Sequence, residues 1–192
     1  MARPRVFEQS DILDTAERVV FRDGAVHLTL DAVATEAGIS KASVIYEFKS
    51  KQQLIDAVIR RRVEIEEERI RAMTVPLRSA PSAAINGLIA AAAERHRDDV
   101  RAVAVDLVAA LAQDGEARGL IEEVHARMIV SVTDTAENPG GAILAFLALK
   151  RLELHDLHPW SDAERADILR DIRWLVDAEH MRSQAHGASA GH

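Results

Sequence analysis

Apolar residues recur every three or four positions along most of this chain, and β-branched residues rarely alternate with polar ones. Such spacing puts the apolar side chains on one face of a helix, whereas a half-buried strand needs strict alternation. Ala, Leu, Arg and Glu dominate the sequence and also favour helix. The pattern predicts an all-α protein of about nine helices, and no strand is expected.

Three short helices are expected in the first fifty residues. The first spans about 10–22 and ends at Gly24, the second follows Thr29 and stops at Gly38, and the third begins after Ser40. Thr and Ser are good N-caps, and glycine ends helices because it tolerates a left-handed backbone. Helices of two turns are marginal alone, so these three must pack together as one unit.

A long fourth helix should begin at a capping box formed by Ser50 and Gln53, and the chain breaks at 73–81, which holds two prolines. A second capping box, Ser161 with Glu164, should start the last helix. The later helices are expected at about 82–97, 99–113, 116–136, 140–156 and 162–180. The predicted domains are a helix-turn-helix DNA-binding domain at 1–52, a helical regulatory and dimerisation domain at 53–182, and a disordered tail at 183–192.

The segment 28–48, LTLDAVATEAGISKASVIYEF, has the pattern of a helix-turn-helix. Ala34 is small enough for two helices to cross closely, and Gly38 supplies the positive φ of the turn. Lys41, Ala42 and Ser43 then lie in the first turn of the third helix, where they can reach base edges in a major groove. The same glycine and caps also occur in helix pairs that bind no DNA, so this segment alone leaves both interpretations open.

The surrounding motifs narrow that choice. An amphipathic first helix ends in a glycine turn and is followed by Leu-Thr-Leu-Asp-Ala-Val-Ala, then Ala-Gly-Ile-Ser-Lys-Ala-Ser, then Tyr-Glu-Phe-Lys-Ser-Lys-Gln-Gln-Leu. In these motifs the run from Ile12 to Leu54 resembles the DNA-binding domain of the TetR family of transcriptional regulators.

The resemblance implies a role for each matching position. Thr29 would contact a phosphate at the start of its helix, and Tyr46 and Lys51 would hold the DNA backbone. The residues Lys41, Ala42 and Ser43 would face bases. Ile45 stands where the family often has tyrosine, so it can make only apolar contact, such as with a thymine methyl group.

Glu47 also departs from the family, which often has a histidine there. Its charge should repel DNA unless it pairs with Lys49 or Lys51. Arg3 and Arg5 could reach the DNA from a basic N-terminal arm, or they could lie in a solubilising terminus. Arg60, Arg61 and Arg62 run into a group of glutamates on the same helix, and we interpret them as partly ion-paired on a solvated face.

The resemblance further implies a C-terminal domain that binds a small molecule and dimerises through its last two long helices. The segment 142–149, AILAFLAL, is apolar on all sides, so it should pack both inward and against a partner. The predicted dimer residues are Ile143, Phe146, Leu147, Ile168, Ile172 and Leu175. The alternative is a monomer in which this segment is a buried central helix.

Residues for an effector site are weakly indicated. Asn86, Asp106 and His125 are polar residues within apolar helical segments, and Met128 and Phe146 could line a pocket. Each could equally be a satisfied core residue. His155 and His158 lie near Glu153, but their spacing crosses a helix end and no thiolate supports a site, so no metal and no cofactor are expected.

The net charge of −7 is unevenly distributed. Residues 1–63 hold 10 basic and 9 acidic side chains, whereas residues 64–192 hold 14 and 22, so a DNA-binding end is permitted. The chain has no cysteine, no signal-like start and no apolar run of membrane length, which predicts a cytoplasmic protein without membrane contact.

We therefore expect a sequence-specific DNA-binding regulator that is a homodimer. Its partners should be a palindromic operator in double-stranded DNA and a small-molecule effector that releases a repressor from it. The alternative is a helical dimerising interaction module without specific DNA binding. Glu47 would be the first indication of it, because its charge should repel DNA. No enzyme is expected, because the sequence has no Gly-rich phosphate loop, no zincin histidine pair and no Gly-flanked nucleophilic serine.

Overall fold

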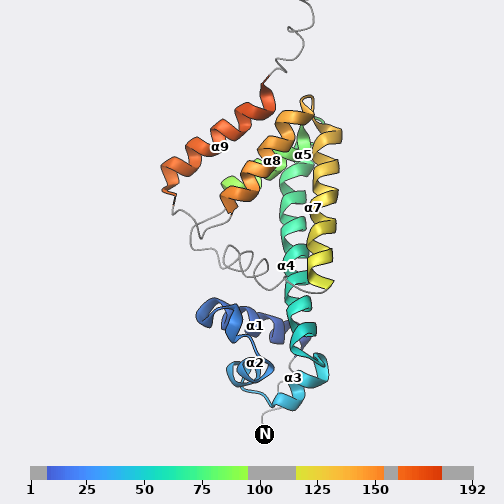
Figure 1. Ribbon diagram of the computed structural model, residues 1–192, viewed down its shortest axis with the longest axis vertical. Coiled ribbons are helices and arrows are strands. Elements are labelled where there is room, and N and C mark those ends of the chain that lie inside the picture. The colour runs from blue at the N-terminus through green and yellow to red at the C-terminus, as the bar shows by residue number, and fades with distance from the viewer. Residues whose placement is uncertain (1–7, 95–115, 154–159, 179–192) are drawn as a thin grey trace, which may run out of the picture. The chain divides into compact units, whose positions relative to one another are not determined.

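The computed structural model of the chain describes residues 8–94, 116–153 and 160–178. These residues form α-helices and two short 3₁₀ turns without any strand, which confirms the predicted all-α class (Figure 1). The helices are α1 (Gln9–Asp23), α2 (Leu30–Ala37), α3 (Lys41–Glu47), α4 (Lys51–Thr74), α5 (Ala83–Ala93), α7 (Glu116–Thr135), α8 (Pro139–Glu153) and α9 (Asp162–Asp177), and the turns are η1 (Ala25–His27) and η2 (Val75–Leu77). The helix expected at 99–113 and the tail from 183 lie outside the described residues.

The caps of the short helices form as predicted. The Thr29 hydroxyl accepts a hydrogen bond from the Ala32 N–H at 3.0 Å, and the Ser40 hydroxyl accepts one from the Ser43 N–H at 3.1 Å. Gly38 between the two helices has φ +67°, in the left-handed region that favours glycine. Local hydrogen bonds therefore set where α2 ends and α3 begins.

Of the two predicted capping boxes, one is complete. The Ser161 hydroxyl accepts from the Glu164 N–H at 3.2 Å, and the Glu164 carboxylate accepts from the Ser161 N–H at 2.8 Å. Ser50 likewise caps Gln53, but the Gln53 side chain accepts from the N–H of Lys49, one residue earlier than a capping box requires. The second half of that prediction is wrong, because the Gln53 side chain accepts from the Lys49 N–H and not from that of Ser50.

The chain divides into two compact units, and the division falls within α4 and α7. Unit 1 comprises residues 1–67 and 96–123, and unit 2 comprises residues 68–95 and 124–192. The helix α4 supplies Leu54 to the core of unit 1 and Ile70 to that of unit 2. The predicted domain boundary after residue 52 marks the end of the expected DNA-contacting segment, and it stays a prediction.

In unit 1, α1, α2, α3 and the first half of α4 enclose one apolar core. Leu28, Val33, Val44 and Phe48 are buried and hold the two short helices against α1 and α4. Their burial supplies the tertiary packing that helices of two turns need.

Charged side chains add to this packing. Arg61 pairs with Asp14 and Arg62 pairs with Glu17, so both arginines connect α4 to α1. The predicted ion pairing is therefore confirmed for Arg61 and Arg62, but their partners lie on α1 and the two side chains are partly covered rather than fully solvated. The partners are distant in sequence, and helical spacing on α4 alone could not reveal them.

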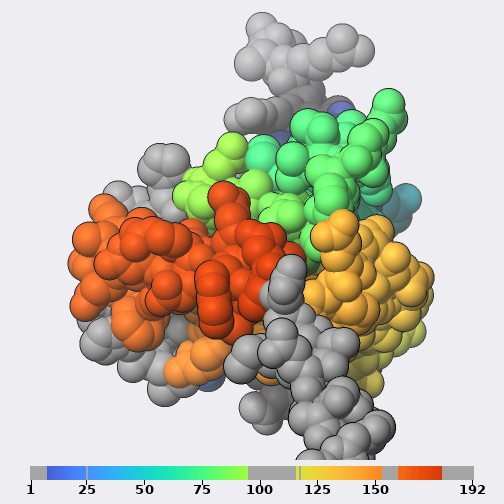
Figure 2. Space-filling view, turned by 90° about the horizontal axis from the view of Figure 1, so that it is seen from above, coloured from blue at the N-terminus to red at the C-terminus, as the bar shows by residue number. Residues whose placement is uncertain are grey.

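In unit 2, α5, α8 and α9 pack around a second core, to which Val132 of α7 also contributes. Asn138 joins two helix ends: its amide donates to the carbonyl oxygens of Leu175 and Ala178, and its own carbonyl accepts from the Gly141 N–H at 3.1 Å. Figure 2 shows α9, in orange to red, on the surface of this unit.

Candidate DNA-binding surface

The seven predicted DNA-contacting residues lie on unit 1, and all of them are exposed. They are Thr29 at the cap of α2, Lys41, Ala42, Ser43, Ile45 and Tyr46 on α3, and Lys51 at the start of α4. Val44, on the same helix, is fully buried. It anchors α3 in the core and leaves the other side chains uncovered, as a helix that enters a DNA groove requires.

Lys41 is held by an acidic side chain of the neighbouring helix. Its ammonium group donates a hydrogen bond to Oδ2 of Asp31 at 2.7 Å, across the turn at Gly38. Asp31 lies in the first turn of α2, next to the Thr29 cap. The sequence analysis assigned no role to Asp31, because only the packed turn brings two residues ten positions apart into contact.

Tyr46 has a second lysine beside it. The Lys49 ammonium donates to the Tyr46 carbonyl oxygen at 2.5 Å and lies 5.0 Å from the centroid of the tyrosine ring. A cation at the last carbonyls of a helix is favourable, and its position against the ring adds a cation–π contact. Lys49 therefore positions Tyr46, a role that sequence reasoning missed because it considered Lys49 only as a partner for Glu47.

Glu47 remains the unfavourable residue of this surface. Within the described residues it forms no ion pair, since Lys49 binds the Tyr46 carbonyl and Lys51 contacts no acid. Glu47 therefore does not form the ion pair with Lys49 or Lys51 that would cancel its repulsion of DNA. Its side chain is half-buried.

The outer side of α1 is connected to α2 by another charged group. Arg22 donates to Glu36 at 2.5 Å and to its neighbour Asp23. These hydrogen bonds raise the pKa of Arg22 above its ordinary value, and the bond from Arg22 lowers the pKa of Asp23. Arg22 and Asp23 therefore both stay charged at neutral pH.

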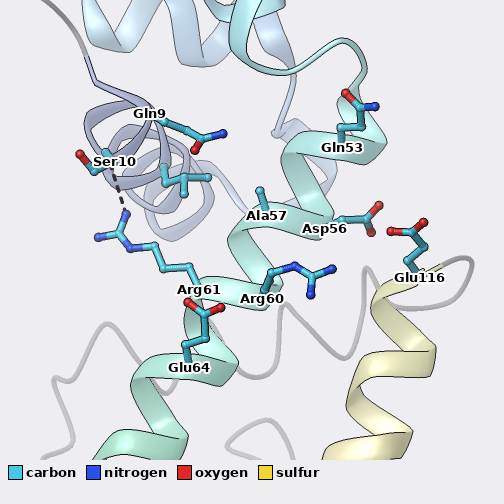
Figure 3. Close-up of a pocket in the computed structure, with 10 residues that line it drawn as sticks. Gln9, Ser10, Gln53, Asp56, Ala57, Arg60, Arg61, Glu64 and Glu116 are labelled. Carbon is cyan, nitrogen blue, oxygen red and sulfur yellow. Dashed lines mark hydrogen bonds between the residues drawn. The ribbon is translucent and has the colours of Figure 1, made fainter.

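A groove of about 550 Å³ opens in unit 1 along α1 and α4, with the start of α7 at its edge (Figure 3). Arg61 reaches back across it and donates to the Ser10 carbonyl oxygen at 3.3 Å. Arg60 points to the other side, where Asp56 and Glu116 lie. None of the predicted effector residues lines this groove, and its walls carry charged side chains of both signs.

The predicted effector residues that are described lie in unit 2. His125 is exposed and meets the ring of Phe146 edge-on, with centroids 6.2 Å apart, and Met128 packs against the core. The Asn86 amide donates to the carbonyl oxygen of Pro81, just before α5 begins, at 3.3 Å, so its hydrogen-bonding capacity is partly satisfied. Asp106 lies outside the described residues, as do His155 and His158, and the described residues contain no group of three potential metal ligands.

Of the six predicted dimer residues, two are buried and four are at least partly exposed. Phe146 and Ile172 are each 3% exposed and belong to the core of unit 2, so their side chains are not offered to a partner. Leu147 is 55% exposed, and Ile143, Ile168 and Leu175 are half-buried. Leu144 and Trp174, which were not predicted, are exposed on the same two helices. Helical spacing could have identified Leu144, because it lies three residues before Leu147 and therefore on the same face of α8.

Comparison with known proteins agrees with this description. Residues 12–58 match the family of bacterial regulatory proteins of the tetR type. The sequence has no match among curated proteins.

Solved structures share the fold over most of the chain. One is a protein of Saccharomonospora viridis, described as a transcriptional regulator, in complex with choline (TM-score 0.70, 17% identity, covering 88% of this chain and 94% of that one). Another is the multidrug binding protein EbrR with malachite green (TM-score 0.67, 20% identity, 86% and 95% covered). A third is a TetR-like transcriptional regulator of Rhodococcus sp. RHA1 (TM-score 0.64, 20% identity, 90% and 97% covered).

The predicted resemblance to the TetR family is therefore confirmed, by the family match at residues 12–58 and by the fold. The fold is that of TetR-type transcriptional regulators, with an N-terminal helix-turn-helix. Among the described helices, none combines the length and the apolar character needed to cross a membrane.

Proposed function

We propose that this protein is a sequence-specific DNA-binding regulator that acts as a homodimer on a palindromic operator, and that a small-molecule effector releases it as a repressor. The observation that carries the proposal is the exposed face of α3. Lys41, Ala42, Ile45 and Tyr46 are uncovered there while Val44 anchors the helix, within the segment that matches the regulator family.

The DNA contacts are assigned by chemistry. Lys41 and Ser43 can hydrogen-bond to base edges, and Ile45 can contact a thymine methyl group. Thr29, Tyr46 and Lys51 would hold phosphates, the first with the help of the α2 dipole.

Dimerisation is supported by the uncovered apolar side chains of α8 and α9. Leu144, Leu147 and Trp174 are each more than half exposed, and large exposed apolar side chains such as these favour an interface. A symmetric pairing of these two helices would form a four-helix contact. Two recognition helices about 34 Å apart could then enter successive major grooves.

The effector is proposed to act through α4. This helix is continuous from Lys51 to Thr74 and contains neither glycine nor proline, so no residue in it favours a kink. Two of the similar structures are complexes with choline and with malachite green, which supports control by a small molecule. An effector that prefers the DNA-free form by about 1–3 kcal/mol would lower DNA affinity 5- to 150-fold.

The decisive experiment selects bound sequences from random DNA with the purified full chain. Enrichment of a palindrome would support the DNA-binding function, its symmetry and the homodimer together. No enrichment at low salt would overturn the proposal and favour an interaction module, the function that the unpaired charge of Glu47 allows.

Control by an effector needs a separate test, based on reciprocity. A compound found by thermal-shift screening is titrated into the protein with and without saturating operator. Thermodynamic linkage requires that a compound which lowers DNA affinity binds more weakly to the DNA-bound form, by the same factor. Equal affinity in both titrations would show that the compound does not regulate DNA binding.

A further inference from the structure

We propose that Asp31 is a positioning residue that holds the ammonium group of Lys41 at the recognition surface and so raises discrimination between the operator and random DNA. The inference rests on the proposed function and deepens it, because it assigns specificity to an acidic side chain outside the recognition helix.

The geometry ties Lys41 to one place. Asp31 is the second residue of α2 and Lys41 the first of α3, and the Nζ to Oδ2 distance is 2.7 Å. Their side chains are 66% and 53% exposed, so this pair contributes little to stability. Its main effect is therefore to restrict the flexible Lys41 side chain to positions beside Asp31.

The donor count of the ammonium group fits a base contact. A lysine ammonium has three N–H donors, and the bond to Asp31 uses one of them. Two donors remain, which is the number that a lysine directs to the O6 and N7 acceptors of a guanine edge. Asp31 can therefore hold Lys41 without competing for the contact that reads the base.

The same carboxylate discourages binding to phosphates. It neutralises the charge of Lys41, so Lys41 binds a phosphate less readily than a free lysine would. Random DNA offers mainly phosphate contacts, so Asp31 should weaken random binding more than operator binding.

The test replaces Asp31→Asn in the full chain and measures dissociation constants over a series of salt concentrations. The two DNAs are the duplex obtained by selection and a random duplex of equal length. We expect random binding to tighten about five- to tenfold and its log-log salt slope to steepen by about 0.9, as one more phosphate is neutralised. Operator affinity should change less, so the specificity ratio falls by a similar factor. Asp31→Glu should restore much of the ratio.

Glu68→Gln is the matched control, because the Glu68 side chain is also 66% exposed and also pairs with one cation, Arg71, but lies on unit 2. It should leave the specificity ratio unchanged. In a Lys41→Ala background, Asp31→Asn should no longer change the ratio, since a positioning residue acts only through its partner. Thermal unfolding of each variant checks that the helices remain folded.

The possible results are separable. An unchanged ratio in Asp31→Asn, or an equal change in the Lys41→Ala background, would overturn the role of Asp31 while the regulator function stands. If Glu68→Gln lowered the specificity ratio equally, the effect of Asp31→Asn would come from the net charge of the protein and not from the position of Lys41. A native chain that fails to discriminate between the two duplexes would overturn the proposed function itself.

Discussion

In unit 1 two ion pairs and one hydrogen bond to a backbone carbonyl oxygen connect α4 to α1, whereas in unit 2 two arginines connect helices through hydrogen bonds to carbonyl oxygens. Arg61 and Arg62 of α4 pair with carboxylates of α1. In unit 2, Arg69 and Arg165 instead donate to the carbonyl oxygens of Ala91 and Ala92 near the end of α5. Cations at the last carbonyls of a helix are favoured by its dipole, so these arginines act as C-caps.

The exposed side chains of the two units also differ in polarity. Around α3, unit 1 exposes lysines and small polar side chains together with Ile45 and Tyr46, whereas unit 2 exposes Leu144, Leu147 and Trp174. A polar and basic surface suits a polyanion, and an apolar surface suits another protein surface. The contrast is compatible with the partners proposed for the two units, and the following predictions test it.

The largest effect is expected from the buried ion pair of unit 1. The Glu17 and Arg62 side chains are 9% and 13% exposed, and Glu17→Ala would leave the Arg62 charge buried without its partner. The free energy of unfolding should fall by about 3–5 kcal/mol, measured by chemical denaturation. Glu68→Ala breaks an exposed ion pair within α4, and it should lower the free energy of unfolding by less than about 1 kcal/mol. Similar losses in both variants would show that burial does not distinguish these pairs.

The apolar surface of unit 2 should respond to a charge. Leu147→Glu places a carboxylate at a position that would be buried between subunits, so the dimer dissociation constant should rise about a hundredfold or more. Analytical ultracentrifugation over a concentration series would measure it. Val130→Glu on α7 is the control, since Val130 is 57% exposed and Leu147 is 55%. A dimer that persists in Leu147→Glu would exclude this face of α8 from the interface.

A close helix contact within unit 2 gives a smaller effect. A Cβ atom added at Gly87 of α5 would overlap the side chain of Thr74 at the end of α4. Gly87→Ala should therefore destabilise the protein by about 1–3 kcal/mol, in spite of the better helix propensity of alanine. Gly119→Ala, on α7, meets nothing within 4 Å and should be neutral or stabilising by up to about 1 kcal/mol. Equal stabilisation by both changes would contradict the contact.

The smallest change concerns the start of the recognition helix. Ser40→Ala removes the acceptor for the Ser43 N–H and should lower the free energy of unfolding by about 1 kcal/mol. Ser43→Ala leaves this cap in place, and it should have a clearly smaller effect on unfolding. If the two substitutions cost the same, the hydroxyl of Ser40 is not what fixes the beginning of α3.

The sequence by itself determined the helices and most of their ends, because these depend on neighbouring residues. The caps at Thr29, Ser40 and Ser161 and the left-handed Gly38 were predictable from spacing alone. The exposure of the α3 side chains followed from the same periodicity, combined with the resemblance to the regulator family. Effector residues were indicated only by polarity within apolar segments, which does not distinguish a pocket from a satisfied core.

Only the tertiary structure decided which side chains meet across helices. Arg62 could have paired with a glutamate of its own helix, and packing against α1 selected Glu17 instead. Likewise, Phe146 and Leu147 are adjacent and both apolar, yet one is buried in the core of unit 2 and the other is exposed. Periodicity gives the spacing of side chains around one helix, but which face meets a neighbour, and which residue lies opposite, depends on how the helices are packed.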